Sequence, residues 1–389
     1  VAQVYLLYKP IQWVYMLKYV GYLRADFLIG SIIFIILCIK FFLKSNLISL
    51  ENNRITHIDG LRGYLAIGVF FHHYIITYSW KLTGLWERPI NSFFNNLGQF
   101  SVGMFFIITG YLFSRVILND KLDIYSYFKK RVYRLVPLYY VVVFFMFLII
   151  FIDSNFRLNV TAELFVKHIF KWLVFLRTMV NDYANTSQVT AGVTWTLIYE
   201  WLFYLSVPLF FYLKKFKYVN ILIVICLIYL SLSGIVFHFL NTKYISLFLI
   251  GFIVFFIQEK IKLNFNFDTI LISVINLSII ILTVVYFDSY SVYQYLLLGL
   301  IFAMFVFGNS LFGLLKKPFS VALGEITYSI YLVHGIIIYI IFTLIFENFI
   351  ADYGKLYFYM LPFVSIIILS ISVLTYKYIE LPFMKKGKK

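Results

Sequence analysis

Apolar residues occur along this chain in long continuous runs that are separated by short polar links. Each run is close to 20 residues, the length that an α-helix needs to cross a hydrocarbon core of about 30 Å. The runs are too long and too continuous for the alternating strands of a membrane barrel. The pattern predicts about eleven membrane-spanning helices, near residues 27–43, 61–80, 101–118, 136–152, 193–213, 219–238, 243–258, 269–287, 292–314, 322–346 and 357–379.

Composition supports an all-α polytopic membrane protein. Hydrophobic residues make up 62% of the chain and charged residues 13%, and the mean hydropathy is +0.91. A chain this apolar cannot hide its surface in a water-soluble core, so we expect a lipid bilayer around it. The net charge of +16 does not indicate nucleic acid, because the basic residues lie in short links rather than in a basic domain or arm.

The basic links also predict the orientation, because cytoplasmic links of membrane proteins are enriched in Lys and Arg. The C-terminus is expected in the cytoplasm, and residues 1–50 are expected to add one span to a ten-helix domain at 51–389. Successive links alternate between the two sides of the membrane only if residues 165–180 do not cross it. Residues 153–192 are therefore predicted to form an external cap. The links expected to be cytoplasmic hold Lys40 and Lys44, Lys129 to Arg134, Lys214 to Lys217, Lys260 and Lys262, Lys316 and Lys317, and Lys385 to Lys389.

Arg62 and His73 are the most informative pair of polar residues. They lie eleven residues apart in one apolar run, so on a helix they share a stripe and are about 16 Å apart along the axis. Asp59 stands where an N-cap is expected and can pair with Arg62. Ionisable groups inside a membrane usually face a cavity or a partner, which makes the pair a site hypothesis. The alternative for Asp59 and Arg62 is a capped helix whose arginine only sets the membrane topology, and the alternative for His73 is an interhelical hydrogen bond. His72 faces another side of the helix and is interpreted as structural.

A second cluster combines Lys130, Arg131 and Arg134 near the expected cytoplasmic edge. Arg131 and Arg134 share one face of a helix, and two neighbouring guanidinium groups suit the binding of phosphates. Simple anchoring of the topology explains the same residues equally well. We expect both arginines to be exposed, with little to pack against.

Glu200 follows Trp195 by five residues at the external end of another predicted span. Its expected depth is close to that of His73, and a carboxylate near a histidine can orient the imidazole and stabilise its protonated form. Trp195 is equally typical of the aromatic belt at a membrane interface.

Two further strings carry candidate residues. Gly110 favours close helix packing over ligand binding. Tyr328, Tyr331 and His334 recur at every third position, with His334 at mid-membrane depth, although a structural hydrogen bond explains each of them. The six histidines are scattered, and Cys38 and Cys226 lie inside apolar runs, so no metal site is expected.

Taken in order, these strings resemble the acyltransferase 3 family of integral membrane acyltransferases. The resemblance runs from about residue 57 to 383 and includes Glu380 in the final string. Thr109 and Thr327 replace serines that are frequent in the family. The strings are HIDGLRG from His57, then VGMFFIITGYL, KKRVYRLVPLYY, TWTLIYEWLFYL, LGEITYSIYLVH and YIELPF.

The resemblance implies a bacterial cytoplasmic-membrane enzyme that takes an acyl group from cytoplasmic acyl-CoA, with acetyl-CoA expected, and delivers it to a hydroxyl of a glycan or lipid-linked saccharide. Arg62 and His73 match the family's essential Arg and His, and Arg131 and Arg134 match its basic motif. His73 is expected to be the general base, oriented by Glu200. The alternative is a transporter that flips a lipid-linked sugar or exports a polymer through the same polar groups.

The predicted orientation can be tested by cysteine labelling. A cysteine replacing Ser289 should react with a membrane-impermeant maleimide in intact cells, whereas one replacing Lys316 should not, because only the first faces outward. Equal labelling of both positions would contradict the orientation. A cysteine replacing Asn185 tests the cap, since labelling only after the cytoplasmic side is opened would mean that residues 165–180 cross.

Overall fold

The structure is a computed structural model, and it describes most of the chain. The predicted span at 219–238 and the labelling position Ser289 lie largely or wholly outside the described residues. The described residues are 25–48, 50, 56–89, 91–216, 226, 227, 229, 233–237, 240–261, 265–287, 290–347 and 356–388.

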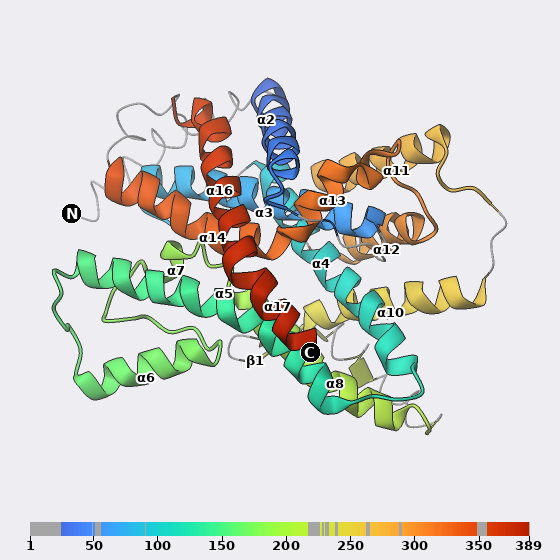
Figure 1. Ribbon diagram of the computed structural model, residues 1–389, viewed down its shortest axis with the longest axis horizontal. Coiled ribbons are helices and arrows are strands. Elements are labelled where there is room, and N and C mark those ends of the chain that lie inside the picture. Colours follow the sequence, from blue (N-terminus) through green and yellow to red (C-terminus); the bar gives the residue numbers. More distant parts are fainter. Residues whose placement is uncertain are drawn as a thin grey trace.

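Helices dominate the described chain (Figure 1). A two-stranded antiparallel pair, β1 (Val236–Phe237) and β2 (Leu240–Asn241), leads into the 3₁₀ turn η1 (Thr242–Tyr244). A second 3₁₀ turn, η2 (Leu314–Lys316), precedes α13, and two π-helical segments, η3 (Ile340–Ile345) and η4 (Tyr376–Glu380), adjoin α-helices. These helices are α2 (Ala25–Lys44), α3 (Thr56–Thr83), α4 (Ser92–Leu118), α5 (Ile124–Asp153), α6 (Ala162–Leu173), α7 (Thr186–Val189), α8 (Trp195–Leu213), α10 (Ile245–Lys260), α11 (Ile270–Tyr286), α12 (Val292–Val306), α13 (Pro318–Glu325), α14 (Thr327–Tyr339), α16 (Leu361–Thr375) and α17 (Leu381–Lys388).

The helices confirm a polytopic membrane protein that is almost entirely α-helical. Within the described residues, six helical stretches are long and apolar enough to cross a membrane, and α11 and α12 are shorter apolar helices. The number of about eleven spans stays a prediction. The six stretches are Ser92–Leu118, Ile124–Asp153, Trp195–Leu213, Thr242–Lys260, Thr327–Ile345 and Leu361–Lys388.

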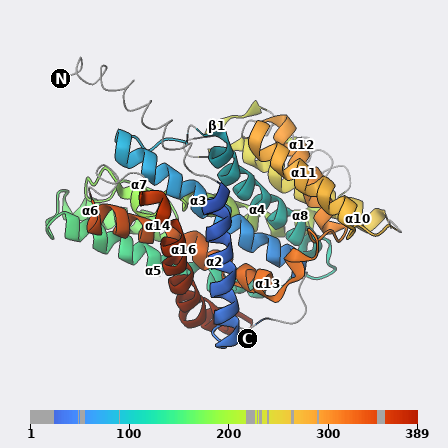
Figure 2. The same ribbon diagram turned by 90° about the horizontal axis from the view of Figure 1, so that it is seen from above.

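Helix α3 is the most polar of the long helices and one of the most enclosed. It contacts α4, α13 and α14, and most of its 28 residues are buried. Around this centre, α2 lies beside α16, and α17 crosses α5 (Figures 1 and 2). Enclosure by other helices shields the polar side chains of α3 from lipid, where they would be costly.

Glycines allow the closest helix crossings. A Cβ atom on Gly324 of α13 would lie 2.1 Å from the carbonyl oxygen of Asp59 on α3. A Cβ atom on Gly110 of α4 would lie 2.2 Å from the carbonyl oxygen of Phe248 on α10. Both positions are therefore restricted to glycine by contact with a neighbouring backbone. The structure supports the interpretation of Gly110 as a packing residue.

The segment predicted to form a cap packs along the second half of α5. The 12-residue helix α6 runs antiparallel to α5, with Phe165 against Phe151 at one end and the Tyr139 hydroxyl donating to the Trp172 carbonyl, at 2.7 Å, at the other. Twelve residues of helix extend about 18 Å, which is shorter than a membrane core of about 30 Å. The location of residues 153–192 outside the membrane stays a prediction.

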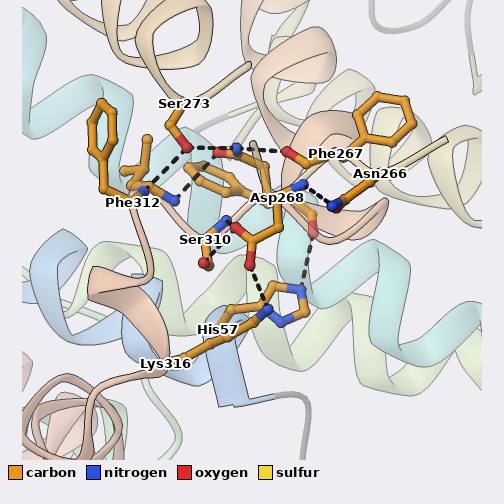
Figure 3. A network of polar contacts seen from close by, with 11 residues as sticks. His57, Asn266, Phe267, Asp268, Ser273, Ser310, Phe312 and Lys316 are labelled. Atoms are coloured by element: carbon orange, nitrogen blue, oxygen red, sulfur yellow. Dashed lines mark hydrogen bonds and ion pairs between the residues drawn. The ribbon is translucent and has the colours of Figure 1, made fainter. Parts of the chain in front are cut away.

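A polar network joins the links on either side of α11 and α12 (Figure 3). Asp268 accepts hydrogen bonds from the Lys316 ammonium group at 2.7 Å and from the Ser310 hydroxyl at 2.6 Å. Asn309 donates to the Phe267 carbonyl at 2.9 Å. Burial would raise the pKa of Asp268, but the hydrogen bonds from Lys316 and Ser310 outweigh it and lower this pKa below its usual value.

The same network reaches the start of α3. The His57 imidazole donates from Nε2 to the carbonyl oxygen of Phe305, at 2.9 Å, near the end of α12. The network therefore fixes the chain just before α13 and the first turn of α3 relative to α12. Helices α3 and α13 cross at Gly324, so the network supports the geometry of the candidate site.

Candidate active site

Arg62 and His73 lie on one continuous helix, as predicted. Asp59 accepts a hydrogen bond from Arg62, at 3.4 Å between Oδ1 and Nη1. The prediction of Asp59 as an N-cap is wrong, because α3 begins at Thr56 and places this carboxylate inside the first turn. A carboxylate in the first turn is still favourable for the helix dipole, and here it also holds Arg62.

A cavity of about 130 Å³ lies between α3, α4, α5, α8 and α14. Six candidate site residues from the sequence analysis line it and come from α3, α5, α8 and α14: Arg62, Arg131, Arg134, Glu200, Tyr328 and Tyr331. This volume is below the roughly 300–1,000 Å³ of a pocket that encloses a drug-sized ligand, so a large donor can be enclosed only in part. The polar side chains that line it are Arg62, Thr109, Arg131, Arg134, Thr196, Glu200, Tyr204, Thr327, Tyr328 and Tyr331.

Arg131 stands in the wall of this cavity inside a cage of aromatic rings. Its guanidinium carbon lies 4.6 Å from the ring centroid of Phe113 and 5.7 Å from that of Tyr204, with Tyr127 at 5.8 Å. The expectation of exposed side chains is wrong for both arginines, because each is partly buried in the cavity wall and the rings of α4 and α8 cover Arg131. Its buried Nε atom makes no hydrogen bond among the described residues, so this donor is left for a ligand or a water molecule.

Arg134 lines the same cavity one turn along α5, whereas Lys130 does not. Lys130 is exposed, and its backbone packs near Gly387 of α17. Arg131 and Arg134 thus lie in one cavity wall, as their shared helix face predicted. Arg62 lines the same cavity, and Lys130 does not.

Glu200 also lines the cavity and accepts a hydrogen bond from the Tyr204 hydroxyl one turn further along α8. Trp195 lies further back on the same helix and packs against Tyr244, with ring centroids 5.0 Å apart. Trp195 belongs to this aromatic cluster and does not line the cavity. The hydrogen-bond partner of Glu200 is Tyr204 and that of His73 is His334, so the expected orientation of His73 by Glu200 is not seen as a direct contact.

The partner of His73 is His334 on α14. The Nδ1 atom of His73 lies 3.1 Å from Nε2 of His334, and the two rings are stacked with centroids 5.2 Å apart. His334 is fully buried, and its Nδ1 atom lies 2.9 Å from the carbonyl oxygen of Ile330. His73 keeps part of its surface accessible.

Tyr331 connects the histidine pair to the cavity. Its ring lies in the cavity wall and is 6.3 Å from the ring of His334, one turn further along α14. Its hydroxyl donates to the Val193 carbonyl at 3.2 Å and lies 2.8 Å from the Thr196 hydroxyl. Neither His73 nor His334 lines the cavity, and Tyr331 is the wall residue that contacts the histidine pair.

His72 has a packing role. Its Nδ1 atom donates to the carbonyl of Phe94 at 2.8 Å, and its buried ring fills the space beside Gly98. These contacts with α4 agree with the interpretation of His72 as structural, although its ring also lies edge-on to that of His73, with centroids 5.0 Å apart.

Glu380 and Tyr328 hold α14 in place. Glu380 is buried on η4 and accepts a hydrogen bond from the hydroxyl of Ser329. Tyr328 reaches the opposite neighbour, since its hydroxyl donates to the Leu135 carbonyl on α5 at 2.7 Å. Glu380 does not line the cavity, and its contacts indicate support for the helix that carries Tyr331 and His334.

Sequence reasoning missed Tyr204 and the ring of Phe113, which complete the surroundings of Glu200 and Arg131. Tyr204 follows Glu200 by four residues, and this helical spacing was a usable signal for their contact. Phe113 gave no signal, because an aromatic residue in an apolar run is normal. Among the described residues, no group of three or more His, Cys, Asp or Glu side chains is arranged to hold a metal ion.

The sequence model of a family described as an acyltransferase domain matches residues 55–377, well over half of the chain. The chain therefore belongs to the acyltransferase 3 family. It is similar to the O-acetyltransferase OatA of Staphylococcus aureus, in strains NCTC 8325 and COL alike, with 26% identity over an alignment of 375 positions that covers 85% of this chain. The chain spans 57% of the length of these curated relatives. No solved structure matches it.

The aromatic cage predicts that Arg131 contributes to stability. Arg131→Ala should lower the free energy of unfolding by about 1–2 kcal/mol, since a desolvated cation over aromatic rings contributes on that order. Lys130→Ala is the matched control and should leave stability unchanged because that side chain is exposed. Thermal unfolding of the purified protein in detergent measures both, and an equal loss in the two variants would contradict the cage.

Proposed function

We propose that this chain transfers an acyl group, which we take to be acetyl, from acyl-CoA to a hydroxyl of a glycan or lipid-linked saccharide. The observation that carries the proposal is the cavity, which has three arginines in its wall and also Tyr331, whose ring lies 6.3 Å from that of His334, the partner of His73. The family match and the similarity to an enzyme named as an O-acetyltransferase support it.

The arginines of the cavity suit the anionic part of the donor. Arg62, Arg131 and Arg134 come from two helices and converge on one cavity wall. Guanidinium groups bind phosphate oxygens through paired, charge-assisted hydrogen bonds. Because the cavity is too small to enclose a nucleotide, we propose that the phosphates of acyl-CoA stay at its mouth and the acyl arm extends toward Tyr331.

The histidine pair suits proton transfer. We propose that His73 takes the proton of the acceptor hydroxyl while that oxygen attacks the thioester carbonyl carbon. The carbon–sulfur bond then breaks, and the thiolate leaves with the proton that His73 had taken. An ester and free CoA are the products, and the imidazole returns to its neutral form.

The location of the reaction follows from the basic links. We propose that the protein lies in the cytoplasmic membrane of a bacterium with its C-terminus in the cytoplasm, because the links rich in Lys and Arg face that side. Arg131 and Arg134 lie in the basic stretch near the start of α5, which would give the donor site access to cytoplasmic acyl-CoA.

Separate substitutions should separate chemistry from donor binding. His73→Ala should reduce acetyl transfer roughly a hundredfold to ten-thousandfold and leave acetyl-CoA affinity unchanged, because the arginines line the cavity and His73 does not. Arg134→Ala should instead weaken acetyl-CoA binding by about tenfold or more, the loss of a charge-assisted contact. CoA release with candidate glycans and calorimetric titration with acetyl-CoA measure the two effects.

The control for His73→Ala is His72→Asn, whose amide can still donate to the Phe94 carbonyl. This variant should keep most of the activity. Near-normal acetyl transfer by a folded His73→Ala protein would contradict the role of His73 as the base. A wild-type protein that releases no CoA but moves a lipid-linked saccharide across liposome membranes would be a transporter.

A further inference from the structure

His334 controls which nitrogen of His73 carries a proton. The Nδ1 atom of His334 lies 2.9 Å from the carbonyl oxygen of Ile330, in the preceding turn of its own helix. A carbonyl oxygen only accepts hydrogen bonds, so Nδ1 of His334 must carry the proton in that bond. A neutral imidazole has one N–H group, which leaves Nε2 of His334 as an acceptor.

The acceptor of His334 points at His73. Its Nε2 atom lies 3.1 Å from Nδ1 of His73, so the bond between the rings requires the proton on Nδ1 of His73. The remaining nitrogen of His73, Nε2, then holds a lone pair. That lone pair is what a general base needs, and the nitrogen that holds it belongs to the one residue of the pair that is not fully buried.

The surroundings favour a neutral and immobile His334. Its side chain has no exposed surface, and the ring of Phe70 lies 6.2 Å away between centroids. The next residue, Gly335, contacts the backbone of Thr190, where a Cβ atom would lie 2.4 Å from the carbonyl carbon. This contact fixes the turn of α14 that carries His334, so the ring has little freedom to turn away from His73.

We infer that His334 is a positioning residue that holds His73 in the tautomer with its proton on Nδ1 and its basic lone pair on Nε2. The inference rests on the proposed function, because it explains how His73 serves as the base. When His73 gains a proton at Nε2, its existing bond from Nδ1 to His334 becomes charge-assisted and stronger. The chain of bonds ends at a backbone carbonyl, so no carboxylate has to be buried beside the pair.

Two amide substitutions distinguish this role from a purely structural one. In His334→Gln, the side-chain amide reaches the place of Nε2 and can accept the proton of His73, while the bond to Ile330 is lost. In His334→Asn, the shorter amide reaches only the place of Nδ1, so it keeps the bond to Ile330 and loses the one to His73. The two variants differ by one methylene group.

If His334 positions His73, His334→Gln should keep most of the wild-type kcat, and His334→Asn should lose about 10–100-fold in kcat, the usual effect of removing such a supporting hydrogen bond. The KM for acetyl-CoA should not change in either variant. Activity in the Asn variant with loss in the Gln variant would overturn the inference, because it would show that only the bond to Ile330 matters. Equal activity of the two folded variants would overturn it as well.

A second measurement does not depend on activity. Nitrogen NMR of protein labelled with ¹⁵N-histidine, compared with His73→Ala to assign the signals, reports which nitrogen of His73 carries the proton. We expect the proton on Nδ1 in the wild type and in His334→Gln, and a mixture of tautomers in His334→Asn. A proton on Nε2 in the wild type would overturn the inference. A wild type that transfers no acetyl group would refute the proposed function alone, since the tautomer is still measured.

Discussion

Each histidine of α3 has to meet a hydrogen-bonding partner from a neighbouring element, and this constraint determines the arrangement around the site. His57 is held by a carbonyl of α12, His72 by a carbonyl of α4, and His73 by His334 of α14. Unpartnered groups at these depths would cost several kcal/mol each. The close crossing at Gly324 brings α13 and α14 near enough to α3 to supply such a partner.

The same constraint explains why the charged groups line the cavity and the histidines do not. The arginines are arranged where Asp59, Glu200 or aromatic rings can accompany a permanent positive charge. The histidines lie deeper, where a neutral ring is tolerated and a hydrogen bond to a backbone carbonyl is sufficient. An anionic donor held by the arginines can therefore present a neutral thioester to the histidines.

The sequence predicted the helices and the grouping of the arginines well, because both depend on local spacing. Continuous apolar runs located α4, α5 and α8, and the three-residue interval between Arg131 and Arg134 placed both in one cavity wall. Partners across long sequence distances were not predictable in the same way. His73 and His334 are 261 residues apart, and equal expected depth pointed as readily to Glu200.

Local sequence patterns also gave wrong predictions where contacts with other helices extend a helix or cover a side chain. The apolar run near Leu61 suggested a later helix start, but α3 begins at Thr56 because the first turns are covered by η2 and α13. Likewise, Arg131 looked like an exposed cation from its basic neighbours. Only the rings of Phe113 and Tyr204, which come from other helices, show that it is enclosed.

The central claim is that the donor binds at the arginines of the cavity and extends past Tyr331 to His73. The most direct test is an experimental structure of the protein with a non-hydrolysable acetyl-CoA analogue. We predict density for its phosphates against Arg131 and Arg134, with the acetyl carbonyl beyond Tyr331 and beside Nε2 of His73. An analogue bound with its phosphates elsewhere, or with its acetyl group separated from His73 by intact helix packing, would contradict the account.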